Sequence, residues 1–173
     1  MPVGPLTTFF GGLLTILIQY VFRFSTDQLV AITFFIPIIN GLSGNVGMQS
    51  STIVVRGFAT GDINLARIPQ LLPREIATGA LIGSTFGVLC GGITALFASA
   101  MNAGPMLGLV VGISISCGTT LAALLGVLLP AACKKVGIDP AVSAGPFIAT
   151  LLDSTALMLY LGISTSMMHY LQT

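Results

Sequence analysis

The 173-residue chain has very few charged side chains. Only 6% of its residues are Asp, Glu, Lys or Arg, 54% are hydrophobic, and the mean hydropathy is +1.02. A soluble domain usually carries about 25% charged residues, and a compact fold of this size could not cover its surface with so few. The composition therefore indicates an all-α integral membrane protein in a lipid bilayer. The net charge of +1, without any basic run, argues against nucleic-acid binding.

Cysteine and histidine are also scarce. Cys90, Cys117 and Cys133 lie far apart in apolar segments and form no CxxC pair, which argues against a disulfide framework and against a thiolate metal site. The one histidine, His169, is about 24 Å along a helix from Asp153. That separation is too large for a Ser-His-Asp arrangement, so the sequence does not predict an enzyme.

Long stretches without charge divide the chain into apolar segments. Because a helix needs about 20 apolar residues to cross a bilayer, the long uncharged run 76–133 has to turn, and Gly104-Pro105 is a turn signal within it. The pattern predicts five transmembrane helices, at about 6–24, 28–56, 76–100, 106–133 and 140–171.

The basic residues are unevenly distributed between the connecting loops. Short cytoplasmic loops are typically rich in Lys and Arg, and an odd number of spans puts the two termini on opposite sides. We therefore predict a cytoplasmic N-terminus and a C-terminus outside. The basic residues of the second-to-third and fourth-to-fifth loops are Arg56, Arg67, Arg74, Lys134 and Lys135.

The polar stretch between the second and third spans mixes polar and apolar residues at helical spacing. Asp62 or Asn64 could cap a short interfacial helix within about 62–73, and a plain solvated loop is the alternative. The sequence contains no soluble segment and no linker. It predicts a single transmembrane domain over residues 1–173, without a soluble regulatory domain.

Asp153 is a carboxylate deep within an otherwise uncharged segment. Such a group costs about 2.5–3.5 kcal/mol to place at the centre of a membrane helix, and the predicted spans contain no basic residue near it. A protonated, hydrogen-bonded Asp that ties helices together is one interpretation. Because intramembrane ionisable groups usually mark ion or proton pathways, we favour a functional site.

The second predicted span contains a polar, glycine-rich run between Pro37 and Thr52. Packing between helices would explain its glycines but not the combination of Asn45, Gln49 and Thr52, so the pattern favours a water-filled pathway. At about 100° per residue, one helix face carries Gly41, Gly44, Asn45, Met48 and Thr52.

The available ligands are all oxygen atoms: one carboxylate, amides, hydroxyls and backbone carbonyls. Oxygen ligands suit Mg²⁺, Ca²⁺ or Mn²⁺ rather than Zn²⁺ or Cu⁺. One carboxylate per chain is a weak site for a divalent cation, but a symmetric dimer would bring two copies of Asp153 to one axis. Mg²⁺ usually retains several waters, so two carboxylates could hold it in hydrated form.

Two motifs resemble one known family. The run Gly41-Leu-Ser-Gly44-Asn45-Val-Gly47-Met-Gln49, followed by Val54-Val-Arg56-Gly57, resembles the second transmembrane helix of MgtE-type magnesium channels. Asp139-Pro140 and then Gly145-Pro146-Phe147-Ile-Ala149-Thr150-Leu-Leu-Asp153 resemble the start of their fifth helix. The resemblance extends over essentially the whole chain.

The resemblance implies a homodimer whose pore is lined by the second and fifth helices of both subunits. It implies that Asp153 is the principal carboxylate of a site for largely hydrated Mg²⁺. Met48 and Gly145 depart from the family pattern, in which polar residues are found, and both changes remove polar pore groups. The positions that match the family's pore motifs are Gly41, Gly44, Asn45, Gln49, Thr52, Ala149 and Asp153.

The sequence thus predicts a passive, dimeric Mg²⁺ channel of the cell membrane. Many members of the family also carry cytosolic Mg²⁺-sensing domains, which this sequence does not contain. One alternative is a Na⁺- or H⁺-coupled divalent cation exchanger that uses the same site. Another is a non-transporting membrane subunit whose polar residues only hold helices together.

Overall fold

The computed structural model describes residues 3–23, 30–101, 103–140 and 145–167. Throughout these ranges the regular structure is helical, with no strand, which confirms the all-α prediction. His169 and the last residues of the predicted fifth span lie outside the described residues. The elements are α1 (Val3–Val21), the 3₁₀ helix η1 (Val30–Phe35), α3 (Ile36–Thr60), η2 (Leu65–Arg67), α4 (Ile68–Phe97), η3 (Ala98–Met101), α5 (Met106–Lys135) and α7 (Pro146–Ser166).

Four helical stretches within the described residues are long and apolar enough to cross a membrane. They are Val30–Thr60, Leu65–Met101, Met106–Lys135 and Pro146–Ser166. They correspond to the second to fifth predicted spans. The first predicted span corresponds to α1, which contributes a shorter apolar helix, Thr8–Val21.

The third predicted span starts earlier in the structure than the charge pattern indicated. Helix α4 begins at Ile68, not near residue 76, with a proline in its first turn, where proline is favoured. The candidate interfacial segment is therefore a 3₁₀ turn that runs directly into α4. Asn64 caps that turn, because its side-chain oxygen accepts a hydrogen bond from the backbone N–H of Arg67 at 3.1 Å.

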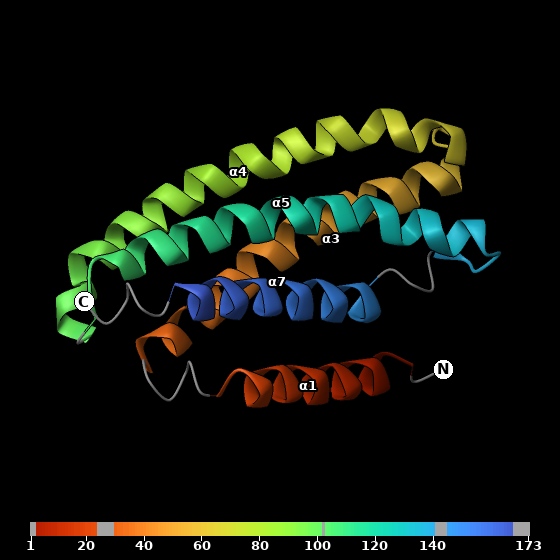
Figure 1. The fold of residues 1–173 in the computed structure, drawn as a ribbon. Coiled ribbons are helices and arrows are strands. Elements are labelled where there is room, and N and C mark those ends of the chain that lie inside the picture. Colours follow the sequence, from red (N-terminus) through yellow and green to blue (C-terminus); the bar gives the residue numbers. More distant parts are fainter. Residues whose placement is uncertain (1–2, 24–29, 102, 141–144, 168–173) are drawn as a thin grey trace.

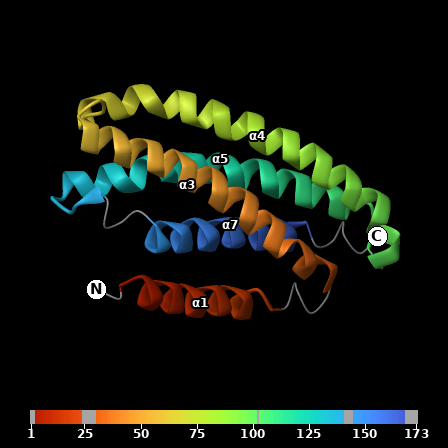
Figure 2. The same ribbon diagram turned by 180° about the vertical axis from the view of Figure 1, so that it is seen from behind.

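The helices form an elongated bundle (Figures 1 and 2). Helix α4 lies along one edge and α1 along the opposite edge, with α3, α5 and α7 between them. Helix α1 packs against α7, and α4 packs against α5 and α3. Helix α1 begins at the end of the bundle opposite to the end at which α7 finishes.

Apolar packing holds α5 and α7 together at the bundle centre. Ile115, Leu157 and Tyr160 are fully buried there, and the Tyr160 hydroxyl donates a hydrogen bond of 2.7 Å to the carbonyl oxygen of Ile32. This bond ties η1, which leads into α3, to α7. The two helices that carry the candidate site residues are thereby fixed relative to each other.

Candidate functional site

The carboxylate of Asp153 lies directly against Gly44. A Cβ atom added to Gly44 would lie only 2.7 Å from the Asp153 Oδ1 atom, closer than real Cβ atoms approach an oxygen. The missing side chain at Gly44 thus makes room for the carboxylate between α3 and α7. Two residues predicted separately, 109 positions apart in the chain, are brought into contact by the fold.

The polar side chains of α3 form an open stripe beside this contact. Asn45, Gln49 and Thr52 are exposed, and they line a groove of about 510 Å³ together with Met48 and Ile53. The helical period predicted that Met48 shares a face with Asn45 and Thr52, and the groove confirms this. The stripe therefore presents two amides and a hydroxyl to the space outside a single chain.

The hydroxyl group of Thr52 is oriented by its own helix. It donates a hydrogen bond of 2.8 Å to the carbonyl oxygen of Met48. Because the proton points back along the helix, the Thr52 oxygen presents its lone pairs to the groove. An oxygen in this state accepts hydrogen bonds from the waters around a hydrated cation.

The remaining predicted residues differ in their surroundings. Gly41 is exposed, with open space where a side chain would be. Ala149 is half-buried and lies one helical turn before Asp153 on α7. Gly145 precedes α7 with φ +99°, a conformation that other L-residues rarely adopt. In this structure the Asn of some family members would therefore be strained at position 145.

A single chain supplies few candidate ligands for a cation. Gly44 precedes Asn45 by one residue, so Asp153 meets α3 about 100° around the helix from the stripe centre. Within the described part of the chain, no group of three or more His, Cys, Asp or Glu side chains could hold a metal ion. The geometry offers one carboxylate and a polar face, which suits a hydrated ion better than a dehydrated one.

Glu75 is a residue that the sequence reasoning misplaced. It precedes the predicted third span, 76–100, by one residue, but in the structure it lies in α4 and accepts a hydrogen bond of 2.7 Å at Oε2 from the Ser50 hydroxyl of α3. The signal that could have found it is Pro69, because a proline in the first turn marks an earlier helix start.

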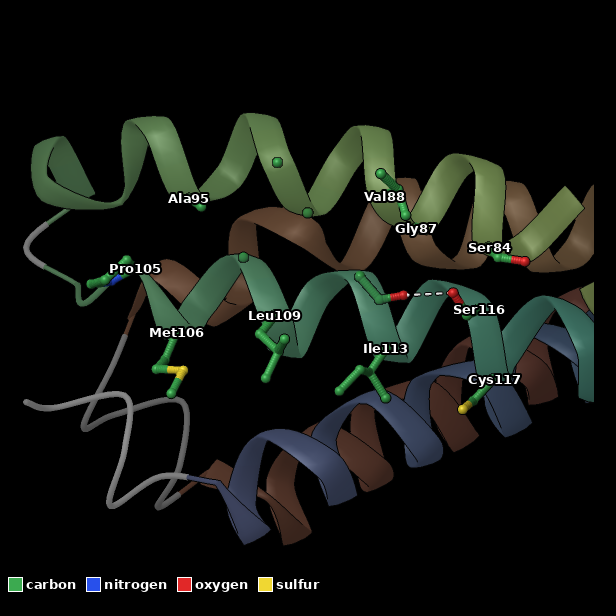
Figure 3. Close-up of a pocket in the computed structure, with 14 residues that line it drawn as sticks. Ser84, Gly87, Val88, Ala95, Pro105, Met106, Leu109, Ile113, Ser116 and Cys117 are labelled. Carbon is green, nitrogen blue, oxygen red and sulfur yellow. Dashed lines mark hydrogen bonds between the residues drawn. The ribbon is translucent and has the colours of Figure 1, made fainter. Parts of the chain in front are cut away.

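A second groove, of about 720 Å³, lies between α4 and α5 (Figure 3). Its walls are formed mainly by glycine and by apolar side chains such as Val88, Leu109 and Ile113. The Ser116 hydroxyl in its wall donates to the carbonyl oxygen of Gly112 at 3.0 Å. Among the described residues, the lining of this groove contains no carboxylate or amide side chain, so its chemistry suits acyl chains and not a cation.

Comparison with known proteins gives a consistent result. Residues 36–163 match the MgtE family model, described as a divalent cation transporter. The magnesium transporter MgtE of Bacillus subtilis (strain 168) is 33% identical over 162 residues, which are 94% of this chain and 35% of that protein.

Two further relatives carry the same name. The magnesium transporter MgtE of Thermus thermophilus is 33% identical over 153 residues, covering 88% of this chain and 33% of the relative. The magnesium transporter MgtE of Enterococcus faecalis is 35% identical over 136 residues, which are 79% of this chain and 29% of that protein. The chain thus spans about a third of the length of these curated relatives.

Proposed function

The chain belongs to the MgtE family of divalent cation transporters, and on that premise we propose that it conducts Mg²⁺ across the cell membrane through a channel-like pore. It is a multi-pass membrane protein, and its family consists of transporters and not of enzymes. The relatives named above are magnesium transporters, which supports Mg²⁺ as the transported ion.

The observation that carries the proposal is the contact between Asp153 and Gly44 next to the polar stripe. A negative charge at this position attracts a divalent cation, while Asn45, Gln49 and Thr52 accept hydrogen bonds from its waters. Mg²⁺ dehydrates reluctantly, so a pathway that contacts the ion through its waters avoids most of that cost. Asp153 is the principal site, and Gly41, Gly44 and Ala149 provide space and backbone oxygen atoms near it.

The pore forms between two copies of the chain. The stripe faces outward from one chain, and one carboxylate only half-balances a divalent charge. If two subunits are related by a two-fold axis parallel to α3 and α7, their stripes face each other across that axis. The two Asp153 carboxylates are then brought to one ion. Helices α3 and α7 of both subunits then line the pathway.

The N-terminus is cytoplasmic and the C-terminus is outside. Helix α1 also crosses the membrane, so the chain has five spans in total. The end of α3, the start of α4 and the end of α5 lie at the same end of the bundle, and they carry five of the six basic residues. That end is the cytoplasmic one by the distribution of positive charge. Residues 1–173 form one transmembrane domain.

Ion movement is driven by the membrane potential. The potential contributes about 2.3 kcal/mol per elementary charge for each 100 mV, and about twice that for a divalent ion. No opposing ion gradient is needed for a passive pore. This requirement separates a channel from a Na⁺- or H⁺-coupled exchanger.

The test is Mg²⁺ entry into proteoliposomes under an inside-negative potential, for the native chain, Asp153→Ala and a control, Asp62→Ala. Asp62 is an exposed carboxylate in the turn after α3. We expect entry in the native chain and the control, and loss in Asp153→Ala. Equal entry in all three would remove Asp153 from the mechanism. Mg²⁺ entry that requires an opposing Na⁺ or H⁺ gradient would indicate an exchanger. A folded dimer that shows no Mg²⁺ entry under any imposed gradient would indicate a non-transporting subunit.

A further inference from the structure

A hydrogen bond between α3 and α4 lies on the side of α3 away from the stripe. Ser50 is buried, with 4% of its surface exposed, and its hydroxyl donates to Oε2 of Glu75 at 2.7 Å. Glu75 is half-buried in the second turn of α4. Within the described residues its carboxylate has no ion pair, and its hydrogen-bond partner is the Ser50 hydroxyl.

The position of Ser50 on α3 explains what this bond can control. Ser50 follows Gln49 by one residue and is therefore about 100° around the helix from it. If a Cβ atom were added to Gly126 of α5, it would lie 3.0 Å from the Cβ atom of Ser50. Ser50 therefore faces the interior of the bundle. Holding Ser50 inward keeps Gln49 at the open groove.

Helix α3 packs on α5 and α7, and within the described residues the Ser50–Glu75 bond is the one side-chain hydrogen bond that joins it to α4. Polar or small residues occur on both its buried and its exposed sides: Ser43, Gly47 and Ser51 are buried, while Asn45 and Gln49 are exposed. A helix with small contrast between its faces is weakly oriented by apolar burial. A directional hydrogen bond to α4 then adds to this packing and favours the rotation that turns the stripe outward.

We propose that Glu75 is a positioning residue of the cation pathway: through Ser50 it stabilises the rotation of α3 in which the stripe faces the pathway and Gly44 meets Asp153. The pathway part rests on the proposed function, whereas the rotation does not. Glu75 does not touch the ion. It acts on Asn45, Gln49 and Thr52 through the helix that carries them.

The experiment measures the rotation and the transport separately. Gln49→Cys is placed in a chain whose native Cys90, Cys117 and Cys133 are replaced by Ala. Its reaction rate with a charged, water-soluble methanethiosulfonate is then measured in proteoliposomes. Mg²⁺ entry is measured in parallel in the same variants without Gln49→Cys.

We expect Glu75→Ala and Ser50→Ala each to lower the thiol reaction rate by roughly fivefold, the effect of one lost net hydrogen bond. The double variant should show no further loss, because both changes remove the same bond. Glu75→Gln should stay near the native rate, since its amide oxygen still accepts from Ser50. Thr78→Ala, one turn along α4, is the control, because the Thr78 hydroxyl donates only to the carbonyl oxygen of Arg74.

Mg²⁺ entry should fall in the same order as the thiol rate. An unchanged thiol rate in both Glu75→Ala and Ser50→Ala would overturn the proposal, and so would reduced thiol rates with native Mg²⁺ entry. If Glu75→Ala fails to fold, Ser50→Ala alone decides, since it removes only a hydroxyl. A native chain without any Mg²⁺ entry would defeat the proposed function, while the thiol rates would still decide whether Glu75 orients α3.

Discussion

Glycine brings helices together in two parts of this molecule, with different results. Between α4 and α5, the space left by glycine is filled by backbone: a Cβ atom added to Gly91 would lie 2.6 Å from the carbonyl oxygen of Gly108. Between α3 and α7, the space left by Gly44 is filled by the Asp153 carboxylate. The same residue type therefore allows close helix packing in one place and makes room for a carboxylate, the proposed ion site, in the other.

The grooves beside these two contacts differ in the same way. The α4–α5 groove is apolar, whereas the groove on α3 is lined by two amides and a hydroxyl. Small residues in membrane helices are typical of close packing, so they are not by themselves evidence of a pathway. The polar side chains next to the glycines make the difference.

The largest expected effect is from filling the space at Gly44. Gly44→Val should reduce Mg²⁺ entry by roughly 100-fold, which corresponds to about 2.7 kcal/mol, because the new side chain would displace the half-buried Asp153 carboxylate. Gly92→Val is the matched control, since nothing lies within 4 Å of a Cβ atom there. Native entry in a folded Gly44→Val protein would mean that the contact between α3 and α7 has no part in transport.

Filling the space at Gly91 should affect stability and not transport. Gly91→Val should lower the free energy of unfolding by about 1–3 kcal/mol, the usual cost of overpacking, because the added side chain would clash with the backbone at Gly108. Thermal unfolding in detergent, again against Gly92→Val, measures the change. If Gly91→Val instead lowered Mg²⁺ entry per folded molecule, the division between packing and pathway would be wrong.

A smaller effect is expected at Met48, which lines the α3 groove without supplying an oxygen. Met48→Asn should lower the half-saturating Mg²⁺ concentration by roughly threefold, because it adds an amide that can accept from the ion's waters. Met48→Leu is the control and should leave it unchanged. The half-saturating concentration is obtained from the concentration dependence of Mg²⁺ entry in proteoliposomes. An unchanged or higher half-saturating concentration for Met48→Asn would exclude a contact with the ion's waters at this position.

Much of this arrangement could be predicted from the sequence. Uncharged runs indicated five helices, because a bilayer requires about 20 apolar residues per span, and four of them are long and apolar enough to cross a membrane. The helical period placed Asn45, Met48 and Thr52 on one groove, and the cost of an intramembrane carboxylate singled out Asp153. These predictions depend on local sequence and on the bilayer alone.

The remainder depends on tertiary contacts that no local pattern encodes. The start of α4 was predicted too late because Arg74 and Glu75 were read as loop charges, although a charged residue can remain helical when a neighbouring helix provides a partner. Ser50 provides that partner to Glu75. The contact of Gly44 with Asp153 likewise required the fold, since periodicity gives a face of a helix and not the helix opposite it.

The smallest effect compares two serines that each bridge neighbouring helices. The Ser116 hydroxyl of α5 lies within hydrogen-bond distance of the carbonyl oxygens of Gly83 on α4, at 3.1 Å, and of its own Gly112. Ser116→Ala should cost about 1 kcal/mol of stability, the net value of a neutral hydrogen bond, and leave Mg²⁺ entry unchanged. Ser50→Ala removes a bridge to the Glu75 carboxylate and should also lower Mg²⁺ entry, because its helix carries the stripe. Measuring unfolding and Mg²⁺ entry for both variants separates the loss of stability from the loss of transport. If both variants lost Mg²⁺ entry equally, any hydrogen bond between helices of the bundle would support transport. The orientation of α3 would then have no particular role.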